Sequence, residues 1–390
     1  MDVTAEDRAS PVRHDEHGDQ DGRSPIGGRL AAWRTRRAVS VGELAARAQI
    51  PPGRIAVLEN GRDWVDRRGE LAALSGALRL DPTDLTGQPY PPAGAEHAAV
   101  RAVAFELRRE IAESAPESLP GSVDDLDART SWVLAAEAAG DEYALALALP
   151  GAIRLADSIA AAAAAPSAAG RQRAADLRVL GHVAAAGLLR RLGYRDLAWM
   201  LLHTARPGGP EPVAVLVEEA RLLIDMALPE YALARAQRAK AAGGDRNLPL
   251  LEALAHAAAG RRQTADGLLH QVAQRAEDAR MLSVVAATRV AVAAEGGSAD
   301  EVAEHARSAD LDALEPAGRA SVMVAAASAH ARLDHPEEAA AHLAAAEELA
   351  PLRVHLDPFA RELLAALPAR TGSPAAAEAV RRIAARAGML

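Results

Sequence analysis

Arginine is the residue type whose spacing in this sequence most clearly indicates a chemistry. Nine arginines lie between Arg29 and Arg68 against four carboxylates, so this segment carries a net charge of +5, although the whole chain of 390 residues carries −9. Guanidinium groups neutralise phosphates and supply much of the affinity of proteins for nucleic acid. The segment is therefore predicted to be a basic module on an acidic protein.

Residues that could form a catalytic or metal site are present but are not arranged as one. The paired carboxylates Glu218–Glu219 and Glu337–Glu338 are adjacent, so on a helix the two side chains of each pair point about 100° apart, as on solvated faces. The twelve histidines are scattered, and there is no cysteine to bind zinc or form a disulfide. No hydrolase, zinc-enzyme or phosphate-loop motif is found, so we expect no enzyme, cofactor or metal site.

The composition predicts an all-α protein. Half of the residues are hydrophobic, mostly alanine, and only 3% are aromatic, which favours helices packed closely on small side chains. No run of about eighteen apolar residues is free of charge, so we expect no membrane span. Residues 1–24 are polar and lack the apolar core of a signal peptide, so they are interpreted as a disordered tail of a cytoplasmic protein.

Residues 25–87, called the head below, have the pattern of short amphipathic helices. Ser40 and Glu43 have the spacing of a capping box, and Asp81 followed by Pro82 is a typical helix start. One predicted helix of about eight residues ends shortly before the next begins, and this spacing is typical of a helix-turn-helix.

The head resembles the phage-repressor (Xre) class of DNA-binding domain over about sixty residues. The residues that carry the resemblance are Leu30, Arg34, Ser40, Glu43-Leu44-Ala45, Ile55, Leu58-Glu59-Asn60-Gly61, Leu71-Ala72, Leu80 and Leu85. The resemblance implies a five-helix, lambda-repressor-like head whose second helix of the pair, Pro52 to Glu59, enters the major groove of double-stranded DNA.

The resemblance also assigns roles to individual residues of the head. Arg34 and Glu59 are expected to pair inside the domain. Arg54 is expected to be the principal reader of bases. The other positions expected to contact DNA are Ser40, Pro52, Gly53, Val57, Arg62, Arg67 and Arg68. Of these, Arg62, Arg67 and Arg68 follow the recognition helix and are expected to face phosphates.

Several positions depart from the family pattern. The recognition helix begins with Pro51-Pro52-Gly53 instead of residues that hydrogen-bond to bases, and Val41 replaces a polar phosphate anchor. Gln49 stands where the family has the glycine of the turn, and a left-handed conformation there costs about 1 kcal/mol. Two alternatives follow: the head binds DNA mainly through arginines and operator shape, or it has lost DNA binding and is an interaction module.

A proline- and glycine-rich segment, 88–95, follows the head and is predicted to be a semi-rigid linker. The text around it, Leu85-Thr-Gly-Gln-Pro-Tyr-Pro-Pro92, resembles the junction in actinobacterial regulators that join an Xre head to a helical-repeat body.

Residues 96–390, called the body, are predicted to be a TPR-like solenoid of helix hairpins. Helix-breaking positions recur every 31 to 39 residues, at Gly193, Pro229, Gly260, Gly296, His335 and Thr371. Small residues with a larger apolar residue three or four positions later recur in the second helices, as in Ala198, Leu202 and Ala205, or Ala265, Leu269 and Val272. This spacing lets neighbouring helices approach closely.

A hairpin stack has a concave groove that could bind an effector. Polar or soft residues on the predicted first helices are its candidate lining: Arg178, His182, Arg190, Glu219, Asp225, Met226, His256 and Arg289. The sequence thus predicts a homodimeric transcriptional regulator that binds operator DNA through the head and senses a small molecule, peptide or protein through the body. The alternative is an interaction scaffold with a head that does not bind DNA.

Overall fold

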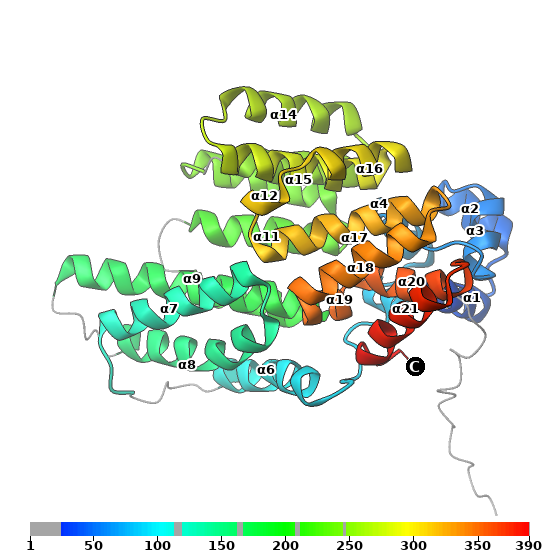
Figure 1. Ribbon diagram of the computed structural model, residues 1–390. Coiled ribbons are helices and arrows are strands. Elements are labelled where there is room, and N and C mark those ends of the chain that lie inside the picture. Colours follow the sequence, from blue (N-terminus) through cyan, green and yellow to red (C-terminus); the bar gives the residue numbers. More distant parts are fainter. Residues whose placement is uncertain (1–24, 113–118, 162–166, 207–210, 245–246, 390) are drawn as a thin grey trace, which may run out of the picture.

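The computed structural model describes residues 25–112, 119–161, 167–206, 211–244 and 247–389, so the predicted tail of residues 1–24 lies outside the described part. Every regular element in these ranges is a helix, as predicted from the alanine-rich composition. Figure 1 shows that the head helices, in blue, lie beside the last helices of the chain, in red.

The head contains five helices that enclose a small apolar core. They are α1 (Pro25–Arg36), α2 (Val41–Ala48), α3 (Pro52–Glu59), α4 (Arg68–Leu78) and α5 (Pro82–Thr86). Leu44 and Ile55 are fully buried in this core. The predicted capping box is present at Ser40 and Glu43, and Gln49 adopts the left-handed conformation, with φ 56° and ψ 36°. Between α2 and α3 the chain therefore turns as the sequence predicts.

The body consists of sixteen further α-helices and two short 3-10 helices within the described residues. The first eight are α6 (Ala95–Ala112), α7 (Val123–Ala139), α8 (Glu142–Ala161), α9 (Ala168–Leu192), α10 (Arg195–Thr204), α11 (Val213–Asp225), α12 (Pro229–Ala241) and α13 (Leu248–Ala258). The others are α14 (Arg262–Arg275), α15 (Ala279–Gly296), α16 (Ala299–Ser308), η1 (Leu311–Ala313), α17 (Pro316–Arg332), α18 (Pro336–Leu349), α19 (Pro351–Leu356), α20 (Pro358–Ala366), η2 (Leu367–Ala369) and α21 (Pro374–Arg386).

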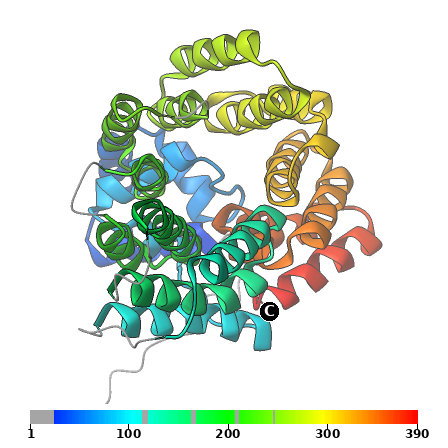
Figure 2. The same ribbon diagram turned by 90° about the vertical axis from the view of Figure 1, so that its left-hand side faces the viewer.

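Each predicted break in the body falls at or next to the end of a helix. Gly193 ends α9 with φ +90°, Pro229 is the first residue of α12, and Gly260 separates α13 from α14. Figure 2 shows that the helices from α9 to α21 follow one another around a curve, with the head beside it. Small residues mark the close contacts along this path, since Ala198 and Ala265 are fully buried.

Residues 88–90 of the predicted linker are packed against the body instead of acting as a spacer, whereas residues 91–95 are exposed and α6 begins at Ala95. The Gln88 side-chain amide donates to the carbonyl oxygens of Arg191, at 2.8 Å, and Leu356, at 3.3 Å. Tyr90 is 8% exposed, and the guanidinium of Arg361 lies 3.9 Å from the centre of its ring. The segment thus ties the head to two distant parts of the body.

One helix of the body, α8, is long and apolar enough to cross a membrane by length and composition alone, with a mean hydropathy of 1.4. Half of its apolar window is buried inside the protein. It also carries Arg154 and Asp157, which pair with Glu110 and Arg178. In this structure α8 packs as a core helix between α6, α7 and α9.

Candidate functional site

The outer side of the α2–α3 pair is left uncovered by the rest of the protein. Ser40, Pro52 and Gly53 are exposed, and Val57 is half-buried. No side chain caps the N-terminus of α3, and a Cβ atom added at Gly53 would meet no atom within 4 Å. Pro52 has no N–H, and the N–H of Arg54 donates to the carbonyl oxygen of Pro51 at 2.9 Å, so among the first three residues of α3 only the N–H of Gly53 is left to meet an anion.

The expected ion pair inside the head is present. Arg34 donates to both carboxylate oxygens of Glu59, at 2.6 and 2.8 Å, and to the carbonyl oxygen of Val39 at 3.0 Å. Because the pair is bidentate and Glu59 is buried, it fixes the end of α1 against the end of α3.

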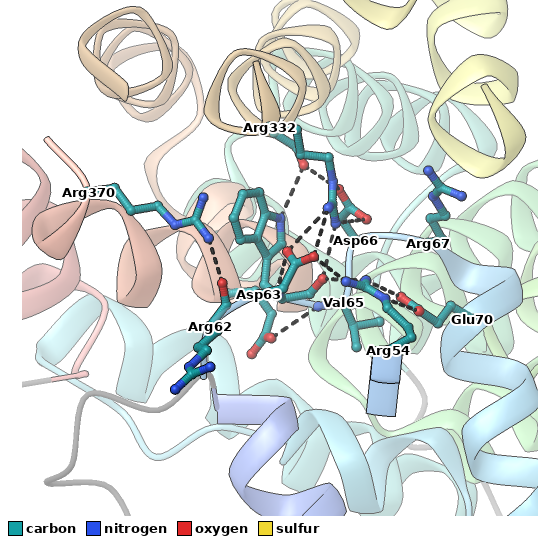
Figure 3. Close-up of polar contacts among 12 residues, drawn as sticks. Arg54, Arg62, Asp63, Val65, Asp66, Arg67, Glu70, Arg332 and Arg370 are labelled. Carbon is teal, nitrogen blue, oxygen red and sulfur yellow. Dashed lines mark hydrogen bonds and ion pairs between the residues drawn. The ribbon is translucent and has the colours of Figure 1, made fainter. Parts of the chain in front are cut away.

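Arg54, the expected base reader, is held inside the protein. Its guanidinium donates to both carboxylate oxygens of Glu70, at 2.7 and 2.8 Å, to the carbonyl oxygen of Trp64 at 3.0 Å, and to Asp63 (Figure 3). Burial by itself lowers the pKa of Arg54, but hydrogen bonding to Glu70 and the charges of Glu70 and Asp63 raise it above its ordinary value. Arg54 therefore joins α3 to α4, and most of its donors are occupied.

Two of the three arginines expected to face phosphates point instead toward the body. Arg68 pairs with Glu295, at 3.2 Å, and Asp225, at 3.5 Å. A side-chain N–H of Arg67 lies 3.5 Å from the carbonyl oxygen of Gly297. Arg62 is exposed, and its carbonyl oxygen accepts a hydrogen bond of 2.6 Å from Arg370. Residues 60–67, which follow α3, are called the Trp64 loop below. This loop is docked on the body, because Gly297 and Arg370 bind it.

Trp64 anchors this loop in the body. It is fully buried among residues of α17, α18, α20 and α21, and its indole N–H donates to Ser328 at 3.3 Å. Arg332 of α17 donates to the carbonyl oxygen of Trp64 at 3.1 Å and to Asp66 at 2.7 and 2.8 Å. Figure 3 shows Arg332 and Arg370 reaching the loop from different helical segments of the body.

A buried carboxylate makes a second connection between head and body. Glu362 of α20 is fully buried and accepts hydrogen bonds from the backbone N–H groups of Ile26, at 2.8 Å, and Val65, at 3.4 Å. One side chain therefore holds both the start of α1 and the Trp64 loop. Its position in the sequence, 336 residues from Ile26, gives no local sign of this role.

The groove candidates fall into separate environments. Arg190 and Asp225 pair with each other and line the same cavity. Glu219 is buried between Arg206 and Arg235, and the buried His182 contacts the carbonyl oxygen of Arg178 at 2.9 Å. Arg178 and His182 also share a neighbour, Asp157. The remaining candidates lie apart: Met226 packs on the apolar core, His256 accepts from Arg261, and Arg289 is half-buried on α15.

Exposed arginines of the head lie where the sequence assigned no role. Arg36 and Arg37 follow one another at the end of α1, and Arg37, Arg47 and Arg79 line a shallow surface hollow. These side chains are exposed, so the positive charge that the head offers to solvent is carried mainly by them and Arg62. The net charge of +5 between Arg29 and Arg68 indicated exposed positive charge in the head, but a net charge does not show which arginines are paired with carboxylates.

No protein-family model, curated protein or solved structure matches this chain.

Proposed function

We propose that this protein is a DNA-binding transcriptional regulator of the cytoplasm that acts as a homodimer, with an Xre-type head and a TPR-like body. The observation that carries the proposal is the uncovered side of the α2–α3 pair, where Ser40, Pro52 and Gly53 are exposed. In a helix-turn-helix this side faces the major groove and the flanking phosphates. A dimer would place two heads on half-sites about one helical turn apart.

The head is proposed to recognise the DNA backbone and shape more than base edges. Arg54 is occupied by Glu70 and Asp63, and Pro52 and Gly53 have no side-chain donors. What remains is the uncapped start of α3 and the exposed arginines Arg36 and Arg47. Surface guanidiniums bind phosphates and are sensitive to groove width, and the N–H of Gly53 adds one backbone donor at the start of α3.

The docked Trp64 loop gives the body a direct means of controlling the head. Arg67 and Arg68 face the body as long as Trp64 stays buried, so the docked head has fewer phosphate contacts than a released one. A change in the curvature of the body that moved Gly297, Glu295 and Asp225 away from the head would free them. This is a differential contact of the kind that regulation between two sites requires.

A substitution at Gly53 tests the proposed DNA contact without disturbing the fold. Glu at this position meets open space in the protein but places a carboxylate before the start of α3. We expect Gly53→Glu to weaken DNA binding at least tenfold, measured by fluorescence anisotropy on fragments found by genome-wide DNA capture. Gly267→Glu is the matched control, because Gly267 of α14 also has open space around it.

The outcome of the capture experiment also separates this proposal from its rival. Recovery of defined fragments, lost in Gly53→Glu and kept in Gly267→Glu, supports the regulator. An empty capture at low salt, with both variants folded, contradicts it.

The second candidate is an interaction scaffold, and one observation favours it. Large apolar side chains are exposed on the first helices of the body, at Phe105 (64%), Trp132 (52%) and Leu147 (58%). Exposed apolar groups of this size are common at protein interfaces. A stoichiometric partner that is lost in Phe105→Ser and Leu147→Ser, with no nucleic acid bound, would support the scaffold.

A further inference from the structure

Three cavities, each partly open to solvent, meet at one side chain of the head. Arg68, the first residue of α4, lines cavities of about 740, 230 and 160 Å³; other head residues line the two smaller ones, and Arg68 is the one head residue in the lining of the largest. The two larger ones also share Arg190, Ile224, Asp225 and Ser321. They adjoin along these residues, so one elongated molecule could occupy both.

The largest cavity is mostly apolar. Of its 24 lining residues, 15 are Ala, Val, Leu, Ile, Met or Gly, and they come mainly from α11, α13, α15 and α17. Leu254, Val284 and Ala287 are examples that are only partly buried and so present apolar surface to the cavity. A volume of about 740 Å³ lies within the range of small-molecule sites, roughly 300–1,000 Å³. The lining favours an occupant with a substantial apolar part.

The adjoining pocket of about 230 Å³ is lined by charged side chains. Its lining includes five arginines and three carboxylates: Arg68, Arg190, Arg191, Arg195 and Arg353, with Glu142, Asp225 and Asp357. Four carboxylates outside the lining pair with these arginines: Glu137 with Arg191, Glu218 with Arg190, Glu295 with Arg68 and Asp81 with Arg195. Among the described residues, Arg353 is the arginine of this set that has no carboxylate of its own.

Arg353 shares its carboxylate with another guanidinium. One oxygen of Glu142 lies 2.9 Å from Arg353 Nε and also 2.9 Å from Arg191 Nε. Burial lowers the pKa of Arg353, and the charge of Arg191 lowers it further. Arg190 is the opposite case: Glu218 and Asp225 contact it and raise its pKa above the ordinary value despite burial. A second anion beside Arg353 would relieve this repulsion.

We propose that the two adjoining cavities bind a small amphiphile, its apolar part among α11, α13, α15 and α17 and a single carboxylate or phosphate group beside Arg353. The inference deepens the proposed function, because such a ligand would touch Arg68 of the head and thereby act as its effector. Binding itself does not depend on DNA.

Isothermal titration of the full chain with three ten-carbon probes tests the proposal, each probe kept below its aggregation concentration. Decanoate and decyl phosphate carry the two candidate head groups, and decanol has the same chain without charge. We expect at least one of the anionic probes to bind at least ten times more tightly than decanol, a difference of about 1.4 kcal/mol. Whichever binds more tightly identifies the preferred head group.

Two variants at opposite ends of the site make the result specific. Ala287→Trp fills the apolar cavity and Arg353→Gln removes the least compensated charge, so each should weaken binding of the anionic probe at least tenfold. Ala375→Trp and Arg381→Gln, at exposed positions of α21, are the matched controls and should bind within twofold of the natural chain.

The proposal is overturned if neither anionic probe binds, if decanol binds equally well, or if both site variants bind like the natural chain. Circular dichroism checks that each variant is folded, and if one of the two is not, the other decides. The titration contains no DNA, so loss of the amphiphile site leaves the proposed regulator standing, and failure of the head to bind DNA leaves the amphiphile site standing.

Discussion

The guanidinium of Arg332 lies 4.6 Å from the centre of the Trp64 ring, although the two residues are 268 positions apart in the chain. The guanidinium of Arg370 lies 4.7 Å from the same ring. Cation–π contacts at these distances add to the burial of the indole, which is complete. The contact fixes a loop of the head in the body, and the first predictions concern its strength and consequences.

Removal of the indole should destabilise the whole protein. Trp64→Ala leaves a cavity among α17, α18, α20 and α21 and should lower the free energy of unfolding by about 3–5 kcal/mol, measured by urea denaturation. Trp132→Ala is the control, because Trp132 is 52% exposed and should change stability by no more than about 0.5 kcal/mol. Equal effects of the two substitutions would show that Trp64 is not an anchor.

Arg54 should prove to be a stabilising residue of the head. Arg54→Ala leaves the partly buried Glu70 without its bidentate partner and should cost about 2 kcal/mol in the free energy of unfolding. A double-mutant cycle with Glu70→Ala should give a coupling energy of at least about 1 kcal/mol. Arg62→Ala, at an exposed position of the adjacent loop, should have little effect. Additive losses in the cycle would contradict the assignment.

Two kinds of feature were predicted correctly from the sequence: contacts between residues that are close in the chain, and turns that depend on the conformation of a single residue. Ser40 and Glu43 are three residues apart, and Gln49 needs only the left-handed turn that ends α2. Arg34 and Glu59 are 25 residues apart, but the helices that carry them are neighbours in a small domain. The recurrent breaks of the body also follow local rules of helix termination.

The roles of Arg54, Arg67 and Arg68 could not be read in the same way. The sequence does not distinguish an arginine that binds a phosphate from one that pairs with a carboxylate. The partner of Arg68 on α15, Glu295, lies 227 positions away in the chain. Such contacts depend on how the body curves around the head. One signal was available: Trp64 is a large apolar residue in a loop of charged neighbours, which indicates that the loop packs on something.

Acid should weaken the protein through His355. Burial lowers the pKa of this imidazole to about 4, against the opposing effect of Glu347, which it contacts at 3.0 Å, and with the help of the nearby His97 and Arg386. Since the folded value lies below the unfolded value of about 6.5, the unfolded chain binds the extra proton more readily. Stability is therefore complete above pH 6.5 and falls as the pH decreases from 6.5 toward 4, by at most about 3 kcal/mol from this group.

The contribution of His355 is separable from that of its neighbours. His97 stacks on His355 with ring centres 5.3 Å apart, and burial lowers the pKa of His97. The pKa of Glu347 is also lowered: burial, the largest influence, raises it, but Arg386 and His355 together outweigh burial. Both groups make stability fall with acid. His355→Gln should reduce the slope of unfolding free energy between pH 4.5 and 6.5, and His203→Gln, on an exposed side chain of α10, should leave it unchanged.

Release of the Trp64 loop should change how DNA binding depends on salt. Arg332→Ala removes the ion pairs to Asp63 and Asp66 and one cation–π contact, and Glu295→Gln removes a carboxylate partner of Arg68, so the double variant should free Arg67 and Arg68 for phosphates. Two added phosphate contacts steepen the slope of log affinity against log salt by about 1.8. Anisotropy titrations at several salt concentrations measure this slope, with Arg382→Ala on the exposed side of α21 as the control. An unchanged slope in the double variant, with DNA binding intact, would mean that the docked loop does not limit the head.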